Sequence, residues 1–137
     1  MGKFDDQVKK HADTYKRRMR AIFQQSAQEL FEEAQTTIPN GGRLPIDLGF
    51  LRASFSASLN GAPQGPSRNP GKASFTYDGA QVSTTINGAK LGDTIWAGWA
   101  AEYSIYMEAR YGFFRGAAQN WPLIVARNTA DAQARIR

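Results

Sequence analysis

Carboxylates are the side chains on which acid–base chemistry in this 137-residue chain would have to depend. The sequence has no cysteine, which excludes disulfides, thiolate metal sites and cysteine nucleophiles. Its single histidine, His11, excludes a histidine-rich metal site and leaves little basis for a histidine triad. Six carboxylates lie outside the first forty residues: Asp47, Asp78, Asp93, Glu102, Glu108 and Asp131.

The spacing of these carboxylates gives no paired acid and base. Asp78 begins a predicted turn, and Asp93 lies in a predicted loop beside a glycine. Glu102 and Glu108 are six residues apart, so a helix would place them on different faces. The sequence also has no Walker loop, no G-x-S-x-G and no Gly-rich fingerprint after a strand. We therefore expect that the protein is not an enzyme and uses no metal or cofactor.

The first forty residues hold the clearest structural pattern. Residues 3–38 contain no Gly and no Pro, and apolar or small residues recur at steps of three and four, which predicts a helix. Such a helix would be about 50 Å long, whereas a domain of this size is about 30 Å across. One end should project or bend back, and a projecting apolar stripe must be buried on something, most simply another copy of the chain. The stripe residues predicted to form an assembly interface are Phe4, Val8, Tyr15, Met19, Phe23, Leu30 and Phe31.

Charge is distributed unevenly along this helix. Residues 3–20 carry seven basic and three acidic side chains, whereas residues 21–38 carry three glutamates and no base. The whole chain has a net charge of +5, which suits either nucleic acid or an acidic protein partner. The basic run at residues 16–20 could bind phosphates, or it could be a solvated face beside a buried Met19.

The middle of the chain alternates apolar and polar residues. Residues 53–59 alternate apolar side chains with serine, as in a half-buried strand. Residues 60–72 hold three Gly and three Pro, which predicts a long loop. Further strands are predicted at 73–77, 82–86 and 94–99. Together they predict an antiparallel β-meander of three or four strands within residues 47–99.

The last part, residues 100–137, has a helical pattern that Gly112 interrupts. Pro122 either kinks the second helix or opens a restarted one with Asn120 near its cap. The predicted fold is thus α+β in a single domain, 1–137: a long helix, a small meander and one or two C-terminal helices.

Aromatic residues are dense between residues 96 and 121, which fits either the core of a small domain or a partner surface. Most are expected in the core. One group of aromatic residues and the arginines beside them are expected at an interface: Arg110, Tyr111, Phe113, Phe114 and Arg115.

Three segments resemble the tail-completion, or head–tail joining (neck), proteins of long-tailed bacteriophages and gene transfer agents. Residues 47–55 (DLGFLRASF) look like the acidic/Thr-Gly-x-Leu-Arg-x-Ser-apolar signature, with Leu48 in place of the usual Thr. Residues 102–108 (EYSIYME) are similar to the Tyr-Ala-x-Tyr-Val-Glu run, although Ala-Arg rather than Gly-Thr follows the glutamate. Residues 112–122 look like the Phe-x-Arg start of a last helix.

This resemblance implies a structural virion protein that forms a ring, of six copies, at the neck and completes the tail. Its partners would be itself, a stopper or adaptor, a tail terminator or tail tube, and genomic DNA passing without sequence recognition. It would assemble in the host cytoplasm, and no apolar run reaches the ~20 residues of a membrane span. The alternatives are a tail terminator or stopper of the same neck and, in another class, a small basic nucleic-acid-binding module.

The first motif also gives a local prediction. We expect Asp47 to cap a turn of helix, Gly49 to allow close backbone approach and Phe50 to dock that turn. Arg52 would then be free to pair with a carboxylate, and Glu108 is the candidate partner. The loop at residues 60–72 is expected to be a second assembly surface, beside the helical stripe.

Overall fold

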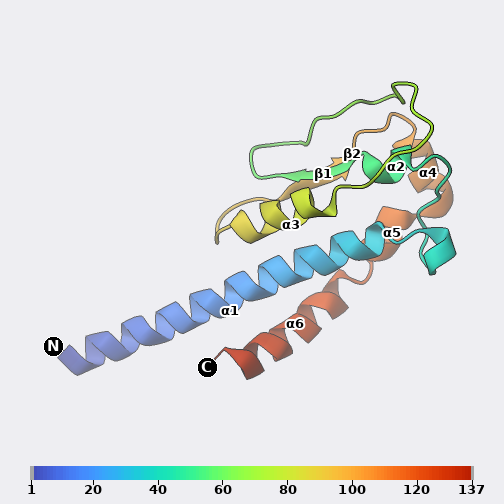
Figure 1. Ribbon diagram of the computed structural model, residues 1–137. Coiled ribbons are helices and arrows are strands. Elements are labelled where there is room, and N and C mark those ends of the chain that lie inside the picture. Colours follow the sequence, from blue (N-terminus) through green and yellow to red (C-terminus); the bar gives the residue numbers. More distant parts are fainter. Residues whose placement is uncertain (1, 137) are drawn as a thin grey trace.

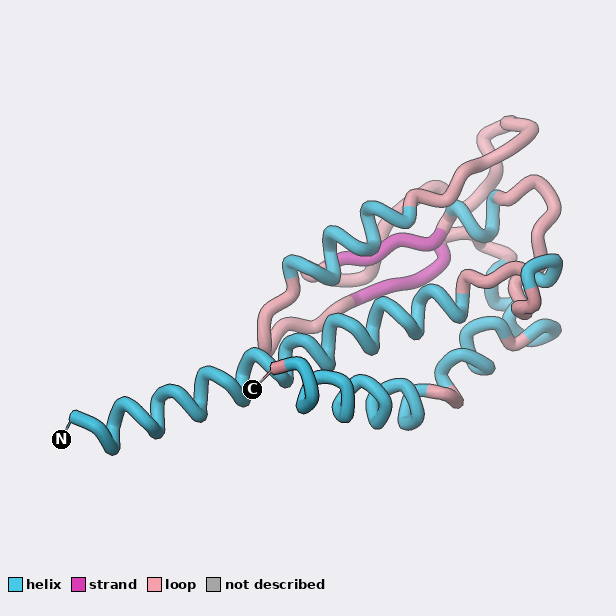
Figure 2. The backbone as a smooth tube through the Cα atoms, turned by 60° about the horizontal axis from the view of Figure 1, so that its bottom comes forward, coloured by secondary structure: helices cyan, strands magenta, loops and turns pink. Residues whose placement is uncertain are grey.

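A body of short elements is built along one half of a single long helix (Figure 1). The structure is a computed structural model that describes residues 2–136. Helix α1 (Gly2–Ala34) has 33 residues, which corresponds to a length of about 50 Å. The predicted long helix is therefore confirmed, and it is straight enough that its N-terminal part extends past the other elements (Figure 2).

The helix ends before the predicted residue 38. The backbone N–H of Ile38 donates to the carbonyl of Leu44 at 3.0 Å instead of continuing the helical ladder. A short 3₁₀ turn, η1 (Ile38–Asn40), follows, with Pro39 in its first positions and Gly41 at φ 90° closing it. The chain thus turns back toward the body where Pro and Gly were predicted to stop the helix.

The sheet has only two strands among the described residues, so the predicted meander is wrong. Strands β1 (Phe55–Ser58) and β2 (Trp96–Trp99) pair antiparallel, with Phe55 opposite Trp99. Residues 73–77 form no strand.

The segment predicted as a return strand is helix α3 (Gly79–Gly88). Val82 and Ile86 alternate with polar residues, but they are also four residues apart, and both are only 1% exposed on one helical face. Asp78, predicted to form a hairpin turn, caps this helix by accepting a hydrogen bond from the N–H of Gln81 at 3.1 Å. The cap at Asp78 and the packing of Val82 and Ile86 in the core select the helix.

Two apolar clusters form the core, and Trp99 lies between them. One cluster contains Ala27 of α1, Phe55 of β1 and the buried face of α3. The other contains the residues Leu44, Phe50, Leu51, Ala101 and Phe113. The Trp99 ring lies 4.7 Å from Phe55 and 4.8 Å from Phe113, and its Nε1 donates to Gln35 Oε1 at 2.7 Å. The indole N–H of Trp99 is therefore hydrogen-bonded, and its ring can pack against both apolar clusters without burying an unpaired donor.

Three helices complete the chain: α4 (Ser104–Tyr111), α5 (Phe113–Ala118) and α6 (Trp121–Arg135). Gly112 has φ 62°, a conformation that favours glycine and separates α4 from α5. Asn120 is the N-cap of α6, with Pro122 in its first turn, so the restarted helix is the correct alternative. Helix α6 returns along α1 (Figure 1), giving the mostly helical α+β fold.

Candidate assembly surfaces

The N-terminal half of α1 presents an apolar stripe that the chain itself does not cover. Phe4 is 74% exposed, Val8 52%, Tyr15 64% and Met19 39%. We call residues 2–19 the projecting half. These are four of the residues predicted to form an assembly interface. Met19 is exposed, so the alternative interpretation of residues 16–20 as a solvated face beside a buried Met19 is wrong. Exposed apolar side chains in a row mark a surface that a partner can cover.

The other stripe residues lie in the half of α1 that the body covers. Phe23, Leu30 and Phe31 are all partly buried, and the ring of Phe31 meets that of Phe55 at 5.4 Å. The cover on the α6 side ends near Arg18, whose Nε donates to the carbonyl of Ile136. The predicted stripe residues of α1 are thus partly buried at one end of the helix and open at the other.

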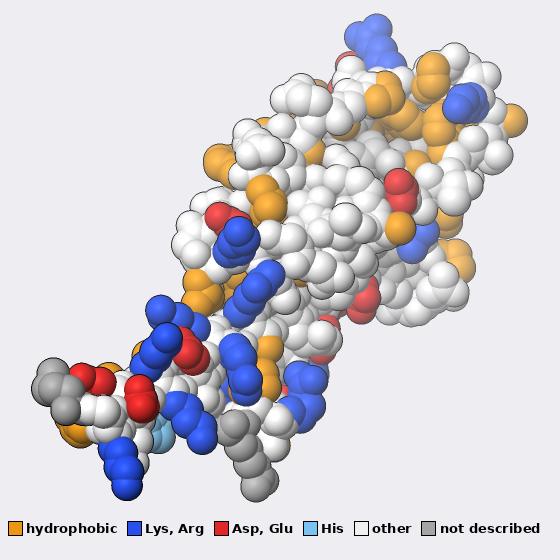
Figure 3. Space-filling view, turned by 60° about the vertical axis from the view of Figure 1, so that its left-hand side comes forward, with side chains coloured by type: hydrophobic (Ala, Val, Ile, Leu, Met, Phe, Trp, Pro, Cys, Tyr) orange, Lys and Arg blue, Asp and Glu red, His pale blue; other side chains and the backbone are white. Residues whose placement is uncertain are grey.

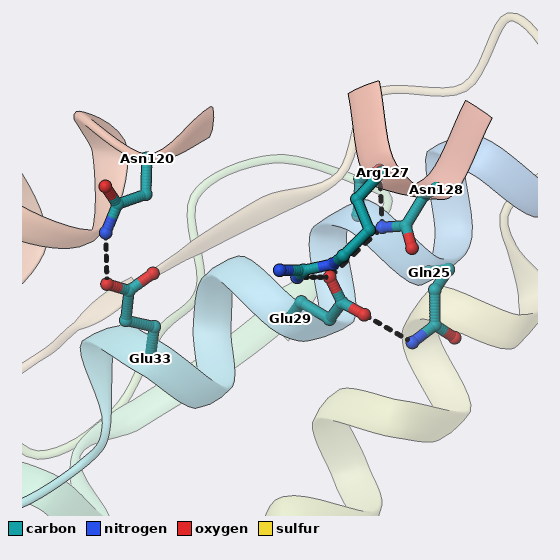
Figure 4. A network of polar contacts seen from close by, with 7 residues as sticks. Gln25, Glu29, Glu33, Asn120, Arg127 and Asn128 are labelled. Carbon is teal, nitrogen blue, oxygen red and sulfur yellow. Dashed lines mark hydrogen bonds and ion pairs between the residues drawn. The ribbon is translucent and has the colours of Figure 1, made fainter. Parts of the chain in front are cut away.

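Polar contacts hold α6 against α1 (Figure 4). Glu29 accepts hydrogen bonds from Arg127 Nη2 at 2.7 Å and from Asn128 Nδ2 at 3.1 Å. Gln25 donates to Glu29 at 3.0 Å, and this bond is the first cause of the lowered pKa of Glu29, ahead of Arg127 and Asn128. Asn128 is buried and also donates to Ser26 Oγ at 3.2 Å. These bonds fix the position of α6 on the covered half of α1.

A second exposed apolar surface lies on α4 and α5. Ile105 is 76% exposed, Tyr106 75% and Phe114 45%. A small cavity of about 240 Å³ opens among Ile105, Phe114 and Trp99. The sequence analysis did not name Ile105, which lies between Tyr103, the N-cap of α4, and Met107, and these two side chains pack on the core. The four-residue spacing from Tyr103 through Met107 to Tyr111 marks the inner face and leaves Ile105 and Tyr106 outside it.

The predicted interface around α5 divides between core and surface. Phe113 is 2% exposed and packs in the chain's own core, so its placement at an assembly surface is wrong. Phe114 and Arg115 are exposed, while Tyr111 is half-buried. The guanidinium of Arg110 lies over the Tyr111 ring at 5.3 Å.

Arg52 and Glu108 do not form the predicted pair. Arg52 Nε donates to the carbonyl of Gln35 at 3.0 Å, and its guanidinium lies 4.9 Å from the centre of the Tyr77 ring. Glu108 instead accepts the backbone N–H groups of Phe114 at 2.9 Å and Arg115 at 2.8 Å. Both side chains therefore anchor local structure rather than bridge the two motifs, because backbone groups were the nearer partners.

The first motif builds helix α2 (Phe50–Ala53) differently from the prediction. Its N-cap is Gly49 and no side chain caps it, so the proposed capping by Asp47 is wrong. The role of Gly49 is confirmed: at φ 85° a Cβ there would lie 3.0 Å from the carbonyl oxygen of Phe75. Phe50 is 6% exposed and docks the turn as expected.

The loop at residues 60–72 has no regular structure but is tied to the start of α4. Arg68 pairs with Glu102 at 2.8 Å, and the N–H of Glu102 donates to the carbonyl of Ser67 at 2.8 Å. These contacts are exposed, and an exposed ion pair adds little to stability. The loop thus remains accessible as a surface.

Within residues 2–136, no three acidic or histidine side chains gather in a way that could hold a metal ion. No helix in that range is both long enough and apolar enough to span a bilayer. No family model, no curated protein and no solved structure matches this chain. The functional argument therefore depends on the surfaces just described and on the sequence motifs.

Proposed function

We propose that this chain is a structural virion protein of a tailed bacteriophage that forms a ring at the neck, completes the tail and joins it to the DNA-filled head. The observation that carries the proposal is the uncovered stripe on the projecting half of α1, from Phe4 to Met19. A helix that extends beyond its own body with an apolar face is suited to contacts with neighbouring subunits.

The motif resemblance supports the placement at the neck. Its first segment forms the docked turn at Gly49 and Phe50, and its last segment spans α5 and the beginning of α6. In a ring, each copy presents one patch to a different patch of the next copy. The expected partners are six copies of the chain, adjoining neck and tail proteins, and DNA that passes without sequence recognition. A tail terminator or stopper of the same neck has the same requirements and is the alternative within the virion.

Removal of the gene tests this function directly. Particles made without the chain should accumulate as separate full heads and finished tails in electron micrographs, and the protein supplied in trans should restore joining. Complete, infectious virions without the chain would overturn the proposal. Heads joined to tails of abnormal length would point instead to the tail terminator.

A nucleic-acid-binding module is the second candidate, because the basic side chains of the projecting half are exposed. The module would bind through Lys9, Lys10, Lys16, Arg17, Arg18 and Arg20, and all of these except the partly buried Arg18 are exposed. Titration of duplex DNA at increasing salt separates the two functions. Tight binding that falls steeply with salt supports the module, whereas negligible affinity supports the assembly role.

A further inference from the structure

A groove with an acidic border lies at the opposite end of α1 from the projecting half. It has a volume of about 560 Å³ between α1 and the start of α6. The residues that line it are Glu29, Glu32, Glu33, Thr36, Asn120, Leu123, Ile124 and Arg127. Leu123 is 65% exposed, so the groove has an apolar side chain open to a partner. We call this feature the acidic groove.

The carboxylates of the acidic groove are only partly neutralised. Glu29 is paired with Arg127 at 2.7 Å. Glu33 accepts a hydrogen bond from the neutral amide of Asn120, and Glu32 accepts one from Gln28 at 2.9 Å. Neither Glu32 nor Glu33 has an ion-pair partner in the described part of the chain, so the groove carries uncompensated negative charge.

The projecting half has the opposite charge. Lysine and arginine side chains gather at the end of the molecule that carries it (Figure 3). Lys9 and Lys16 are seven residues apart and therefore lie on one face of α1, and Lys16 borders the stripe because it is three residues before Met19. A partner that suits this surface therefore has exposed apolar side chains beside carboxylates.

The two surfaces are complementary but cannot meet within one molecule. Val8 and Glu32 lie on the same continuous helix, and their separation of 24 residues corresponds to about 36 Å along its axis. The projecting half can reach an acidic groove only on a second copy.

We propose that the projecting half of α1 of one copy docks on the acidic groove of a second copy. Lys9 and Lys16 face Glu32 and Glu33, and the stripe covers Leu123. The inference rests on the proposed self-assembly and identifies the two surfaces that carry it. Because the two surfaces differ, a docked pair leaves one projecting half and one acidic groove free, and these can bind further copies head to tail into a chain or a ring.

A charge-reversal cycle on the full-length chain tests the contact by sedimentation velocity over a range of protein concentrations. Lys9→Glu with Lys16→Glu, and separately Glu32→Lys with Glu33→Gln, should each weaken self-association by about tenfold or more. Glu33→Gln keeps an acceptor for Asn120, so the fold is preserved. Combining all four substitutions restores one of the two opposite-charge pairs, so the combined variant should self-associate at least about threefold more tightly than either double variant. Circular dichroism checks that every variant is folded.

A matched pair of apolar substitutions tests the stripe itself. Val8→Ser should weaken self-association, whereas Ile46→Ser should not, because Ile46 is similarly exposed (49% against 52%) but lies outside the candidate assembly surfaces. Failure of the four-substitution variant to recover, while it remains folded, overturns the proposed contact. So does a wild-type chain that stays monomeric up to its solubility limit, or equal effects of the two serine substitutions.

These outcomes are distinct from the fate of the neck function. If the combined variant recovers self-association but removal of the gene leaves virions intact, the docking inference holds and the neck function is rejected. A monomeric chain whose loss separates heads from tails would do the reverse. DNA binding gives the third outcome. If the wild type binds duplex DNA, if Lys9→Glu with Lys16→Glu abolishes this binding and if the groove substitutions leave it unchanged, the projecting half is a nucleic-acid surface and the docking proposal is overturned.

Discussion

Phe31 and Phe4 lie on the same helix and in the same apolar spacing, yet their surroundings are opposite. Phe31 packs on Phe55 beneath the two-stranded sheet, while Phe4 is 74% exposed. The two halves of α1 thus show that the apolar spacing predicts a helix, whereas the elements that pack on each half decide how much of its apolar surface is buried. Helix α6 returns only as far as Arg18.

The largest difference in stability between the two halves is expected on removal of the Phe31 ring, which packs on Phe55. Phe31→Ala should lower the free energy of unfolding by about 3 kcal/mol, because the ring leaves a cavity against Phe55. Phe4→Ala should change it by less than about 0.5 kcal/mol, since no packing is lost. Urea unfolding followed by circular dichroism at low protein concentration measures both. Losses of similar size would contradict the distinction between the halves.

A smaller effect is expected where α6 is held on the covered half. Asn128 is 6% exposed and donates to both Ser26 and Glu29. Asn128→Ala should cost about 2 kcal/mol of unfolding free energy, because the buried acceptor Ser26 loses a partner. Asn60→Ala, at an exposed loop position, is the matched control and should be neutral. A neutral Asn128→Ala would contradict a stabilising role for the two hydrogen bonds of Asn128.

The sequence predicts α1 and the C-terminal helices because each has a long run of apolar residues at steps of three and four, and because Gly112 separates two of the helices. It does not predict α3, since Val82 and Ile86 satisfy both a two-residue and a four-residue period. Only packing against Phe55 and Ala27, together with the cap at Asp78, selects the helix. Secondary structure of short segments is thus decided by tertiary contacts that a single sequence does not reveal.

The candidate surfaces follow the same rule. The exposed stripe on the projecting half could be predicted, because the predicted helix is longer than a domain of this size is wide. The sequence could not predict that Phe113 is buried and Phe114 exposed. This difference depends on the turn at Gly112 and on Glu108, which accepts hydrogen bonds from N–H groups in the first turn of α5. The exposure of Ile105 likewise depends on which face of α4 docks.

Acidification should weaken the covered half through Glu29. Its pKa is lowered in the folded chain, first by the hydrogen bond from Gln25 and then by Arg127 and Asn128, against a raising effect of burial. A carboxyl with a depressed pKa contributes stability above its ordinary value of 4.5, and that contribution is lost as the pH falls through the folded pKa. Glu29→Gln should therefore lower stability at neutral pH and flatten its decline at acidic pH. A pH series of urea unfolding curves measures this, and an unchanged acid slope would contradict the role of Glu29.

The smallest effect on stability is expected from removing much of the open half altogether. Deletion of residues 2–16 should change the free energy of unfolding by less than about 1 kcal/mol, because it removes no buried residue and leaves the Arg18 bond to Ile136 intact. The measurement belongs at protein concentrations where the wild type is monomeric, since binding between copies would otherwise add to its apparent stability. A loss of several kcal/mol in the monomer would mean that residues 2–16 support their own body, and the exposed stripe would then lose its significance as a surface reserved for a neighbour.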